Sequence, residues 1–464
     1  MKPRHAHRHY RPPSVTPEHP AYCPACFALI DADTSVCPFC DHDLMRLSGR
    51  EYRDKLLAAL NHPLADVRLR AIIALGWRGE GETAEALARC ALHHPVDIVE
   101  GLQVVESLRN ICDKAARRDA LRMLAQRHPA RVVRLRTAEL SMDDSWGAIV
   151  MSLLPDAQRS STISQESSAV FARAARYLRG RQSPQGGFCF YRTAELDEPS
   201  LFDTYHAVAA LALLGDTVVE QGALLRFVRS FPSTGQLPAL YYRAFILQHL
   251  ARPDLIERNE IRRLLLALPA PGRTPLSSVF RGMFETVRLK RLLGGDLAAP
   301  AVVQWIAGVQ REGGFGKKPN LLDTRHALHV LTDLDGLKEA VASAARDFVD
   351  ALQVPTFGFT VARDSLSSSL EIIHAGVQCC RQLGLPVRYP REVQAFVVAC
   401  QTSDGGMSRV PGALPEIEST HYGIAILRNL GGNERRGGRT LKPGGGDGTG
   451  GAQGVKTAFD VGIG

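Results

Sequence analysis

The sequence predicts an all-α protein in which two kinds of helical hairpin follow a small knuckle of metal-binding type. Three observations carry this prediction. Residues 21–43 contain two Cys-x-x-Cys pairs, residues 50–150 repeat a His-Pro motif, and residues 168–430 repeat a longer pattern of Gln, Gly-Gly and His. The two repeat periods, roughly 33 residues and roughly 37–49 residues, each suit one pair of packed helices.

Composition excludes several classes of protein. With 464 residues, 45% of them hydrophobic and 22% charged, the chain is of globular type and two or three domains are expected. No apolar run reaches the roughly 18 residues that a membrane span needs, so no integral membrane segment is expected. The ten cysteines do not form a disulfide scaffold, which favours a reducing cytoplasm. The net charge of +8 lies largely in the two tails, so nucleic-acid binding is not indicated beyond those tails.

Three segments are expected to lie outside the packed domains. Residues 1–20 are basic and rich in Pro and His, with no apolar stretch of a secretory signal, so we predict a disordered tail. Residues 152–167 are Ser-rich and polar and indicate a linker. Residues 431–464 are Gly-rich and have little to bury, which predicts a flexible tail.

The first folded element is predicted at residues 21–43. Cys23 and Cys26 form one Cys-Pro-x-Cys knuckle, and Cys37 and Cys40 form a second. This spacing lets four thiolates surround one tetrahedral ion, and about twenty residues are too few to form a core without it. We therefore predict a structural zinc ribbon, with iron as the alternative metal. Such ribbons contact proteins or nucleic acids, and the spacing does not distinguish between them.

Helical hairpins are predicted between residues 50 and 150. His62-Pro63 and the ten residues around it match His128-Pro129, and a weaker copy begins at His94-Pro95. Proline favours the first turn of a helix, so each motif is expected to begin the second helix of a hairpin. The pattern resembles HEAT repeats, which stack into solenoids that bind other proteins. We expect the histidines to begin helices rather than to bind metal.

The large domain is predicted at residues 168–430. Three clear copies of its unit join a Gln, a Gly-Gly turn and a His, which are Gln182, Gly186-Gly187 and His206; Gln310, Gly313-Gly314 and His326; and Gln401, Gly405-Gly406 and His421. Degraded copies lie between them. Each Gly pair permits a tight turn with positive φ, and Asp-Thr or Glu-Ser caps the following inner helix. Six such hairpins can close a ring whose inner helices line a central cavity.

The three histidines are aligned at the same position of their inner helices. His206, His326 and His421 would then be spread around the ring rather than gathered at one point. We interpret them first as parts of the repeat architecture, and Asp203 and Asp323 first as helix caps.

The units resemble those of the terpenoid cyclase and protein prenyltransferase superfamily, especially prenyltransferase β subunits. The resemblance covers about 260 residues and rests on the Gln…Gly-Gly-Phe…Asp-Thr-x-His pattern at this period. It implies an (α/α)6 toroid. In that family a β subunit pairs with an α subunit of helical hairpins, so the resemblance also implies that the hairpin segment of this chain covers the toroid in cis.

The resemblance implies a catalytic zinc held by an Asp-x-Cys pair and a His one repeat later. Counting repeats selects Asp364 and His421, but Leu366 stands where the Cys should be. Matching the Gly-Gly-Phe loop selects Asp323 instead, and there Arg325 replaces the Cys and Ser367 the His. Asp364, His421 and Asp323 are therefore the candidate catalytic residues. Neither register completes the triad, and the alternative is a second zinc in the toroid held by Asp364 and His421 with a further ligand such as Glu371.

Six residues are candidates for ligand binding. Basic side chains in or near the cavity would attract a diphosphate, and two inner-helix residues would line it. The candidates are Lys317, Lys318, Arg325, Arg281, His206 and Tyr205. A solvated rim and a packed aromatic core are the alternative interpretations of the basic and aromatic residues.

Two functions follow from these patterns. The first is a ligand- or protein-binding scaffold that lacks a complete catalytic zinc triad and meets a protein partner through its ribbon and HEAT-like hairpins. The alternative is a prenyltransferase-like enzyme, a transferase or terpenoid cyclase in type, that acts on an isoprenoid diphosphate. An isoprenoid or other apolar ligand in the toroid cavity is compatible with both.

Overall fold

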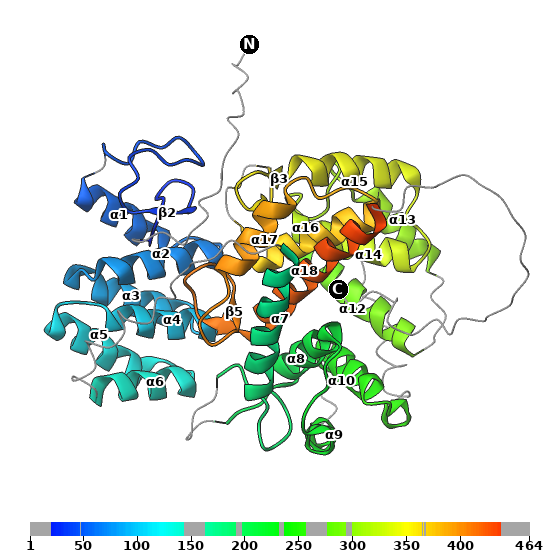
Figure 1. Cartoon of the computed structure of the whole chain (residues 1–464), viewed down its shortest axis with the longest axis horizontal. Coiled ribbons are helices and arrows are strands. Elements are labelled where there is room, and N and C mark those ends of the chain that lie inside the picture. Colours follow the sequence, from blue (N-terminus) through cyan, green and yellow to red (C-terminus); the bar gives the residue numbers. More distant parts are fainter. Residues whose placement is uncertain are drawn as a thin grey trace, which may run out of the picture.

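The computed structural model describes residues 20–46, 48–142, 163–191, 197–231, 236–256, 276–293, 299–363, 365 and 368–437. Regular structure in these residues is mostly helical, as predicted (Figure 1). The predicted tails and linker lie largely outside the described residues. None of the described helices is long and apolar enough to cross a membrane.

The N-terminal knuckles are held by a small antiparallel sheet. Strands β1 (Pro20–Tyr22) and β2 (Leu29–Asp31) pair in the register Ala21 to Ile30. Each Cys-x-x-Cys then closes a tight turn, in which the Cys23 amide donates to the Ala28 carbonyl and the Cys37 amide to the His42 carbonyl, both over 2.9 Å.

Three helical hairpins follow in two layers. Their helices are α1 (Gly49–Ala59), α2 (Ala65–Arg78), α3 (Ala84–His93), α4 (Ile98–Arg109), α5 (Lys114–Arg127) and α6 (Arg131–Met142), with a 3-10 turn η1 at Gly81–Thr83. Helices α2, α4 and α6 pack side by side in one layer, α3 packs on α5 in the other, and α1 packs on α2. We call residues 49–142 the hairpin stack. Its membership of the HEAT family stays a prediction.

The His-Pro motif forms a turn just before the second helix of its hairpin. The expectation that the proline begins this helix is not met in the first repeat, where Pro63 precedes the N-cap residue Leu64 and α2 begins at Ala65. The Nδ1 atoms of His62 and His128 accept from the backbone N–H two residues on, over 3.1 and 3.2 Å. Arg68 and Arg134, six residues beyond the histidines, donate to the carbonyls of the same His residues over 2.9 and 2.7 Å. The middle repeat has Glu100 at this position, and its carboxylate pairs with Arg68 Nε over 2.9 Å.

Inner and outer helices alternate through the large domain. The inner helices are α8 (Leu201–Leu214), α10 (Leu237–His249), α12 (Leu276–Leu292), α14 (Leu321–Asp333), α16 (Leu370–Leu383) and α18 (Ile417–Gly437). The outer helices in the described residues are α7 (Ile163–Gly180), α9 (Gln221–Ser230), α13 (Pro300–Gly308), α15 (Glu339–Ala351) and α17 (Pro390–Ala399). Short elements join them: η3 (Pro253–Leu255), β3 (Gln353–Val354), β4 (Gly358–Phe359), β5 (Met407–Ser408) and β6 (Pro415–Glu416).

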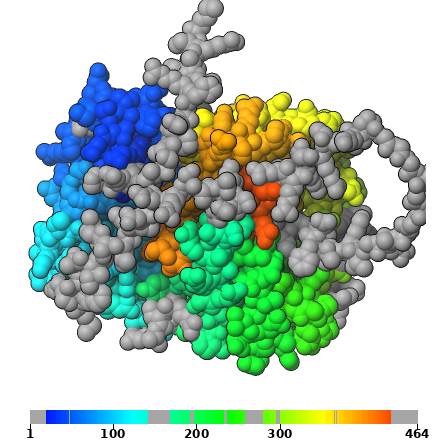
Figure 2. All heavy atoms as spheres, in the orientation of Figure 1, coloured from blue at the N-terminus to red at the C-terminus, as the bar shows by residue number. Residues whose placement is uncertain are grey.

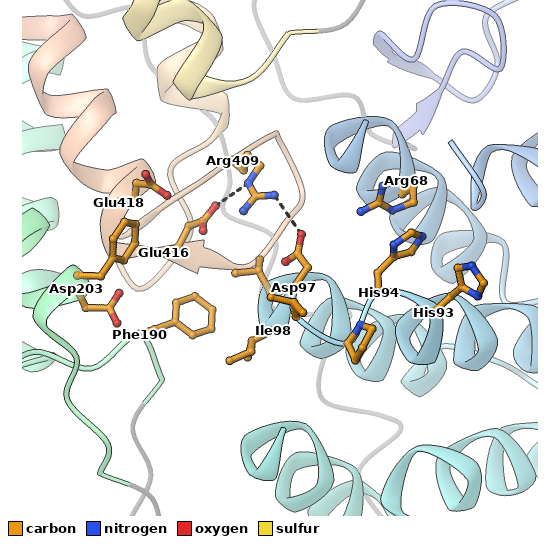
Figure 3. Close-up of a pocket in the computed structure, with 14 residues that line it drawn as sticks. Arg68, His93, His94, Asp97, Ile98, Phe190, Asp203, Arg409, Glu416 and Glu418 are labelled. Atoms are coloured by element: carbon orange, nitrogen blue, oxygen red, sulfur yellow. Dashed lines mark hydrogen bonds and ion pairs between the residues drawn. The ribbon is translucent and has the colours of Figure 1, made fainter. Parts of the chain in front are cut away.

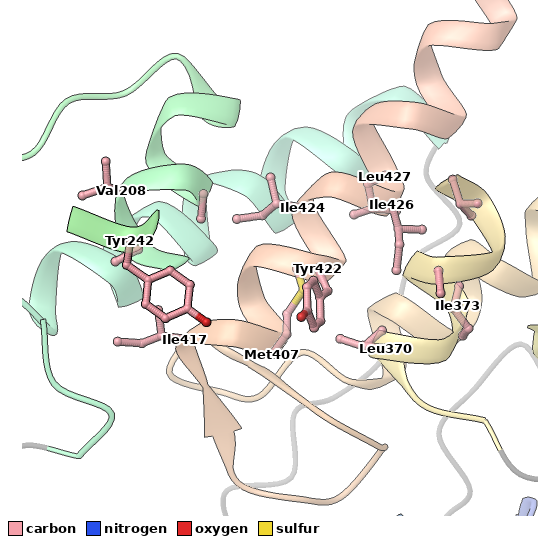
Figure 4. Close-up of a cluster of buried hydrophobic side chains, with 14 of the residues drawn as sticks. Val208, Tyr242, Leu370, Ile373, Met407, Ile417, Tyr422, Ile424, Ile426 and Leu427 are labelled. Atoms are coloured by element: carbon pink, nitrogen blue, oxygen red, sulfur yellow. The ribbon is translucent and has the colours of Figure 1, made fainter. Parts of the chain in front are cut away.

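Each inner helix packs on the next, and α18 packs on α8, so the inner helices close the predicted ring (Figure 1). Apolar side chains fill the joints between them. Figure 4 shows such a cluster, in which Ile417 and Ile424 of α18 lie beside Val208 of α8, and Ile373 of α16 lies on the other side.

The repeated Gln ties each Gly turn to an outer helix. The Nε2 atoms of Gln182 and Gln310 donate to Gly186 O and Gly313 O over 3.1 and 2.9 Å, and also to the carbonyls that begin the next outer helix. The amide of Gln401 donates to Val170 O of α7 over 3.0 Å, which joins the last unit to the first.

The first Gly of each clear pair requires the absence of a side chain. Gly186, Gly313 and Gly405 have φ values of +105°, +84° and +94°, in the left-handed region. A Cβ at these positions would lie 2.0, 2.2 and 2.4 Å from a carbonyl oxygen of the neighbouring outer helix. The sequence-based interpretation of these turns is therefore confirmed.

The ribbon, the hairpin stack and the toroid share one interface. Figure 2 shows the N-terminal part of the chain beside the ring. Tyr22 of the ribbon stacks on Trp77 of α2 with ring centroids 5.5 Å apart, and its hydroxyl donates to Pro411 O of the toroid. Val410 and Ala413 belong to the same apolar cluster as the hairpin stack. The hairpin stack therefore packs against the toroid of the same chain, as the resemblance implies.

Arg409 is the charged centre of this interface. Its guanidinium lies 3.3 Å from Glu416 of its own hairpin, 3.6 Å from Asp97 at the start of α4, and 3.9 Å from Asp66 of α2. Because its side chain is only 22% exposed, these pairs are partly shielded from solvent.

We predict that Gly313→Ala destabilises the protein by more than about 3 kcal/mol. The left-handed conformation costs an Ala about 1–2 kcal/mol, and the close carbonyl adds to that cost. Gly215→Ala is the matched control: Gly215 has a φ of +70° but open space around its Cβ position. It should lose only the conformational part. Denaturant unfolding measures both, and equal losses would contradict the close approach.

Candidate functional site

The four cysteines of the ribbon converge on one point. Their Sγ atoms all lie within 4.8 Å of one another, and the Cys23–Cys40 and Cys26–Cys37 pairs are each 3.7 Å apart. A zinc–sulfur bond of about 2.3 Å gives a tetrahedral edge of about 3.8 Å, so these thiols fit a zinc ion. Elsewhere in the described ranges, no other group of three or more potential ligands converges in this way.

Inside the ring, two of the repeat histidines meet. His206 of α8 and His421 of α18 are joined by a contact of 2.9 Å between their Nδ1 atoms. The expectation that the three histidines are spread around the ring is therefore wrong for this pair. His326 of α14 lies apart from them, with its Nε2 2.8 Å from Arg325 Nη2.

The reason is a shift of one residue in the last unit. The backbone N–H that follows each Gly-Gly pair donates to a Thr hydroxyl, and these hydroxyls belong to Thr204, Thr324 and Thr420. Thr204 lies two residues before His206, whereas Thr420 lies directly before His421. His421 thus occupies the position of Tyr205 in α8, and not that of His206.

With this register, five inner helices present a polar side chain at their fifth residue. These residues are Tyr205, Tyr241, Arg325, His374 and His421. Since equivalent positions of ring-related helices face the same axis, they form a layer across the ring, which we call the axial tier. Helix α12 contributes Phe284, whose ring centroid lies 6.0 Å from the Arg325 guanidinium.

Contacts run through the axial tier from helix to helix. The hydroxyls of Tyr205 and Tyr241 lie 3.3 Å apart, and Arg325 Nη1 lies 3.3 Å from His374 Nδ1. His421 lies between His374 and Tyr205, with ring centroids 6.4 Å from each. His421 Nε2 and Arg325 Nε are buried and have no hydrogen-bond partner in the part of the chain that the structure describes.

The imidazoles in the ring are neutral at pH 7. Burial lowers the pKa of His206 to about 3, and the charges of Arg281 and Arg325 add to this effect. Burial also lowers the pKa of His421 and of His374 well below the usual range. In the His206–His421 pair, one Nδ1 therefore carries the hydrogen and donates while the other accepts.

Two carboxylates lie nearer the rim than the axial tier. Glu371 and Glu418 are the second residues of α16 and α18, about 4.5 Å along the helix from His374 and His421. Burial raises the pKa of both carboxyls, and the charge of Glu418 raises that of Glu371 further. The Tyr422 hydroxyl donates to Glu418 over 2.8 Å.

The remaining residues that the sequence selected as candidates do not belong to the axial tier. The expectation that Asp323 and Asp203 cap their helices is wrong. The N-caps of α14 and α8 are Asn320 and Ser200, whose side-chain oxygens accept from the Asp323 and Asp203 backbone N–H groups, each over 2.9 Å. The Asn320 amide in turn donates to the Asp323 carboxylate over 2.8 Å. Lys317 and Lys318 are exposed on the preceding loop. Arg281 pairs with Glu285 over 3.1 Å, and its side chain is 58% exposed. Asp364 lies outside the described residues.

Sequence reasoning missed three polar residues of the ring as site residues: His374 and Tyr241 of the axial tier, and Glu418 nearer the rim. His374 belongs to a degraded repeat without a Gly-Gly pair, and Tyr241 was interpreted as a core aromatic. Glu418 was treated as part of a capping motif. These residues are found by counting positions from the first residue of each inner helix. That count requires the helix boundaries, which the sequence patterns do not give to the residue.

The comparison with family models agrees with the ring. A family model described as the prenyltransferase alpha-alpha toroid domain matches residues 122–239 and 286–442, which is more than half of the chain. Among solved structures, the chain is similar to Candida albicans protein geranylgeranyltransferase-I complexed with GGPP, at 14% sequence identity and a TM-score of 0.43. That similarity covers 60% of this chain and 93% of the other. No protein of curated function matches the chain.

We predict that His206 stays unprotonated well below pH 6, because its pKa is about 3. An unfolded chain takes up this proton near pH 6.5. Stability should therefore fall as the pH drops below about 6.5, by up to about 1.4 kcal/mol per pH unit for this imidazole. Imidazole nitrogen shifts in NMR measure the titration, and the same chain in urea is the control. A midpoint near 6.5 in the folded protein would contradict the prediction.

Proposed function

Because the chain belongs to the prenyltransferase alpha-alpha toroid family, we propose that it is a ligand-binding scaffold whose ring interior holds one ligand without a catalytic zinc. The single observation that carries the proposal is the axial tier. A protein that used its ring only as a support would be more stable with apolar side chains at these positions, since buried charges cost free energy unless they are paired.

The chemistry of the tier suggests the ligand. Arg325 is permanently charged, and its Nε and His421 Nε2 are buried without partners in the described segments. A negatively charged head with several acceptor oxygens would satisfy both, if His421 carries its hydrogen on Nε2. The apolar tail is proposed from the family match alone, because the apolar side chains of Figure 4 fill the joints between the inner helices. We therefore propose an isoprenoid diphosphate, or a molecule of the same type, as the ligand.

Geranylgeranyl diphosphate is a suitable probe. We predict that it binds the full chain in isothermal titration calorimetry, and that Arg325→Gln weakens binding about 10- to 100-fold, because a charged hydrogen bond is worth about 1.5–3 kcal/mol. Arg226→Gln, the same change on the exposed side of α9, is the matched control. A thermal melt of each variant separates lost binding from lost folding. Equal affinities of the two variants would contradict the proposal.

The second candidate is a prenyltransferase-like enzyme with zinc in the ring. The unpartnered Nε2 of His421 favours it, since this atom is free to ligate a metal. Against it, Arg325 stands where the resemblance requires a Cys, and the Nδ1 of His421 contacts His206.

Zinc stoichiometry separates the two candidates. We propose that the ribbon cysteines hold one structural zinc, because four thiols close a tetrahedral site. We predict one equivalent per full-length chain in elemental analysis, lost in Cys37→Ser and retained in Cys112→Ser, whose thiol is exposed. A second equivalent that His421→Gln removes would support the enzyme instead.

A protein partner and a cytoplasmic location are part of the same proposal. Met45 and Val36 of the ribbon have exposed fractions of 76% and 47%, which supports a contact surface there. All ten cysteines are free thiols, which supports a reducing compartment.

A further inference from the structure

A cavity of about 730 Å³ lies between the hairpin stack and the rim of the ring (Figure 3). The toroid contributes one wall, which includes Phe202 and Asp203 of α8 and Glu418 of α18. The opposite wall is the connection between α3 and α4, residues 93–99. The volume is within the range of sites for small organic ligands, about 300–1,000 Å³.

The charged side chains of this cavity do not balance. Its lining holds the carboxylates of Asp97, Asp203, Glu416 and Glu418 against Arg68 and Arg409. Arg68 pairs with Glu100, outside the lining, and Arg409 pairs with Asp97 and Glu416 (Figure 3). Asp203 and Glu418 have no Lys or Arg within ion-pair distance among the described residues, and the nearest basic group to Glu418 is the His206 imidazole at 3.7 Å.

The cavity also presents apolar surface to solvent. Val96, on the connection between α3 and α4, is 91% exposed, and Ile98, the first residue of α4, is 39% exposed. Phe190 and Phe202 lie on the toroid side of the same cavity. Together these four side chains give the cavity an apolar surface suited to contact with the apolar part of a bound molecule.

We propose that this cavity binds a small amphipathic amine, with the ammonium between Asp203 and Glu418 and the apolar body against Phe202 and Ile98. Charge complementarity selects a cation, and apolar walls select a carbon chain or ring. A metal ion is disfavoured as the occupant, because no three potential ligands of this lining converge within 4.8 Å in the described residues.

The electrostatics of Asp203 and Glu418, which lack an ion-pair partner from Lys or Arg among the described residues, support this occupant. Burial raises the pKa of Asp203 to about 6, and the charges of Glu418 and Glu416 also raise it, against the lowering effect of the Ser200 hydroxyl. At pH 7 most of the Asp203 carboxyls are still ionised. An ammonium ion beside Asp203 and Glu418 favours the ionised form of both carboxyl groups.

Calorimetry on the full chain at about pH 7.5 tests the proposal with three probes of equal length: octylamine, 1-octanol and octanoate. Octylamine is expected to bind at least about tenfold more tightly than the other two. Asp203→Asn and Glu418→Gln should each weaken octylamine binding about tenfold, whereas Asp119→Asn, the same change on the exposed face of α5, should not. Val96→Lys places a cation at the rim without touching the core. It should weaken the binding of octylamine and leave the binding of 1-octanol and octanoate no weaker.

Equal binding of octylamine and 1-octanol, or no octylamine binding, overturns the proposal. So does an unchanged affinity in both Asp203→Asn and Val96→Lys, of which the second cannot be lost to misfolding because Val96 is exposed. Binding at the ring site is measured separately. Geranylgeranyl diphosphate should still bind Asp203→Asn, so failure of one proposal does not imply failure of the other.

Discussion

The ring depends on how closely each Gly turn approaches the next outer helix. At Gly186, Gly313 and Gly405 there is no room for a Cβ, and the repeated Gln binds the turn and the neighbouring helix at once. The last of these contacts joins the sixth unit to α7, so closure uses the same interaction as the joints at Gly186 and Gly313. Closure in turn sets which residue of each inner helix faces the axis, and hence the composition of the axial tier.

The axial tier is costly for a protein that needs only to fold. Arg325, His374 and His421 are buried, and burial keeps the imidazoles neutral. The apolar clusters around the tier supply the stability that these groups do not. Burying donors without partners lowers the stability of the fold, and a ligand that completes their hydrogen bonds would recover that free energy.

The hairpin stack adds a second wall to the ring. Arg409 connects Glu416 of the toroid to Asp97 of α4, and the Tyr22–Trp77 stack fixes the ribbon to the same interface. The cavity beside Asp203 exists only because these two parts meet. The layer of α2, α4 and α6 that is nearest the toroid is partly used within the chain, whereas Met45 beside the ribbon is 76% exposed.

The sequence by itself determined the helical class, the two repeat periods, the ring and the four-cysteine cluster. Each of these follows from short-range rules: the turn that Gly permits, the turn that His-Pro forms before a helix, and the spacing of thiols around one ion. Only the tertiary structure decided which side chains meet inside the ring. A shift of one residue turns a side chain by about 100° around a helix, so aligning His421 with His206 placed it on the wrong face. The local motif is similar in both registers, and the hydrogen bond from Met407 to Thr420, between residues of two elements, distinguishes them.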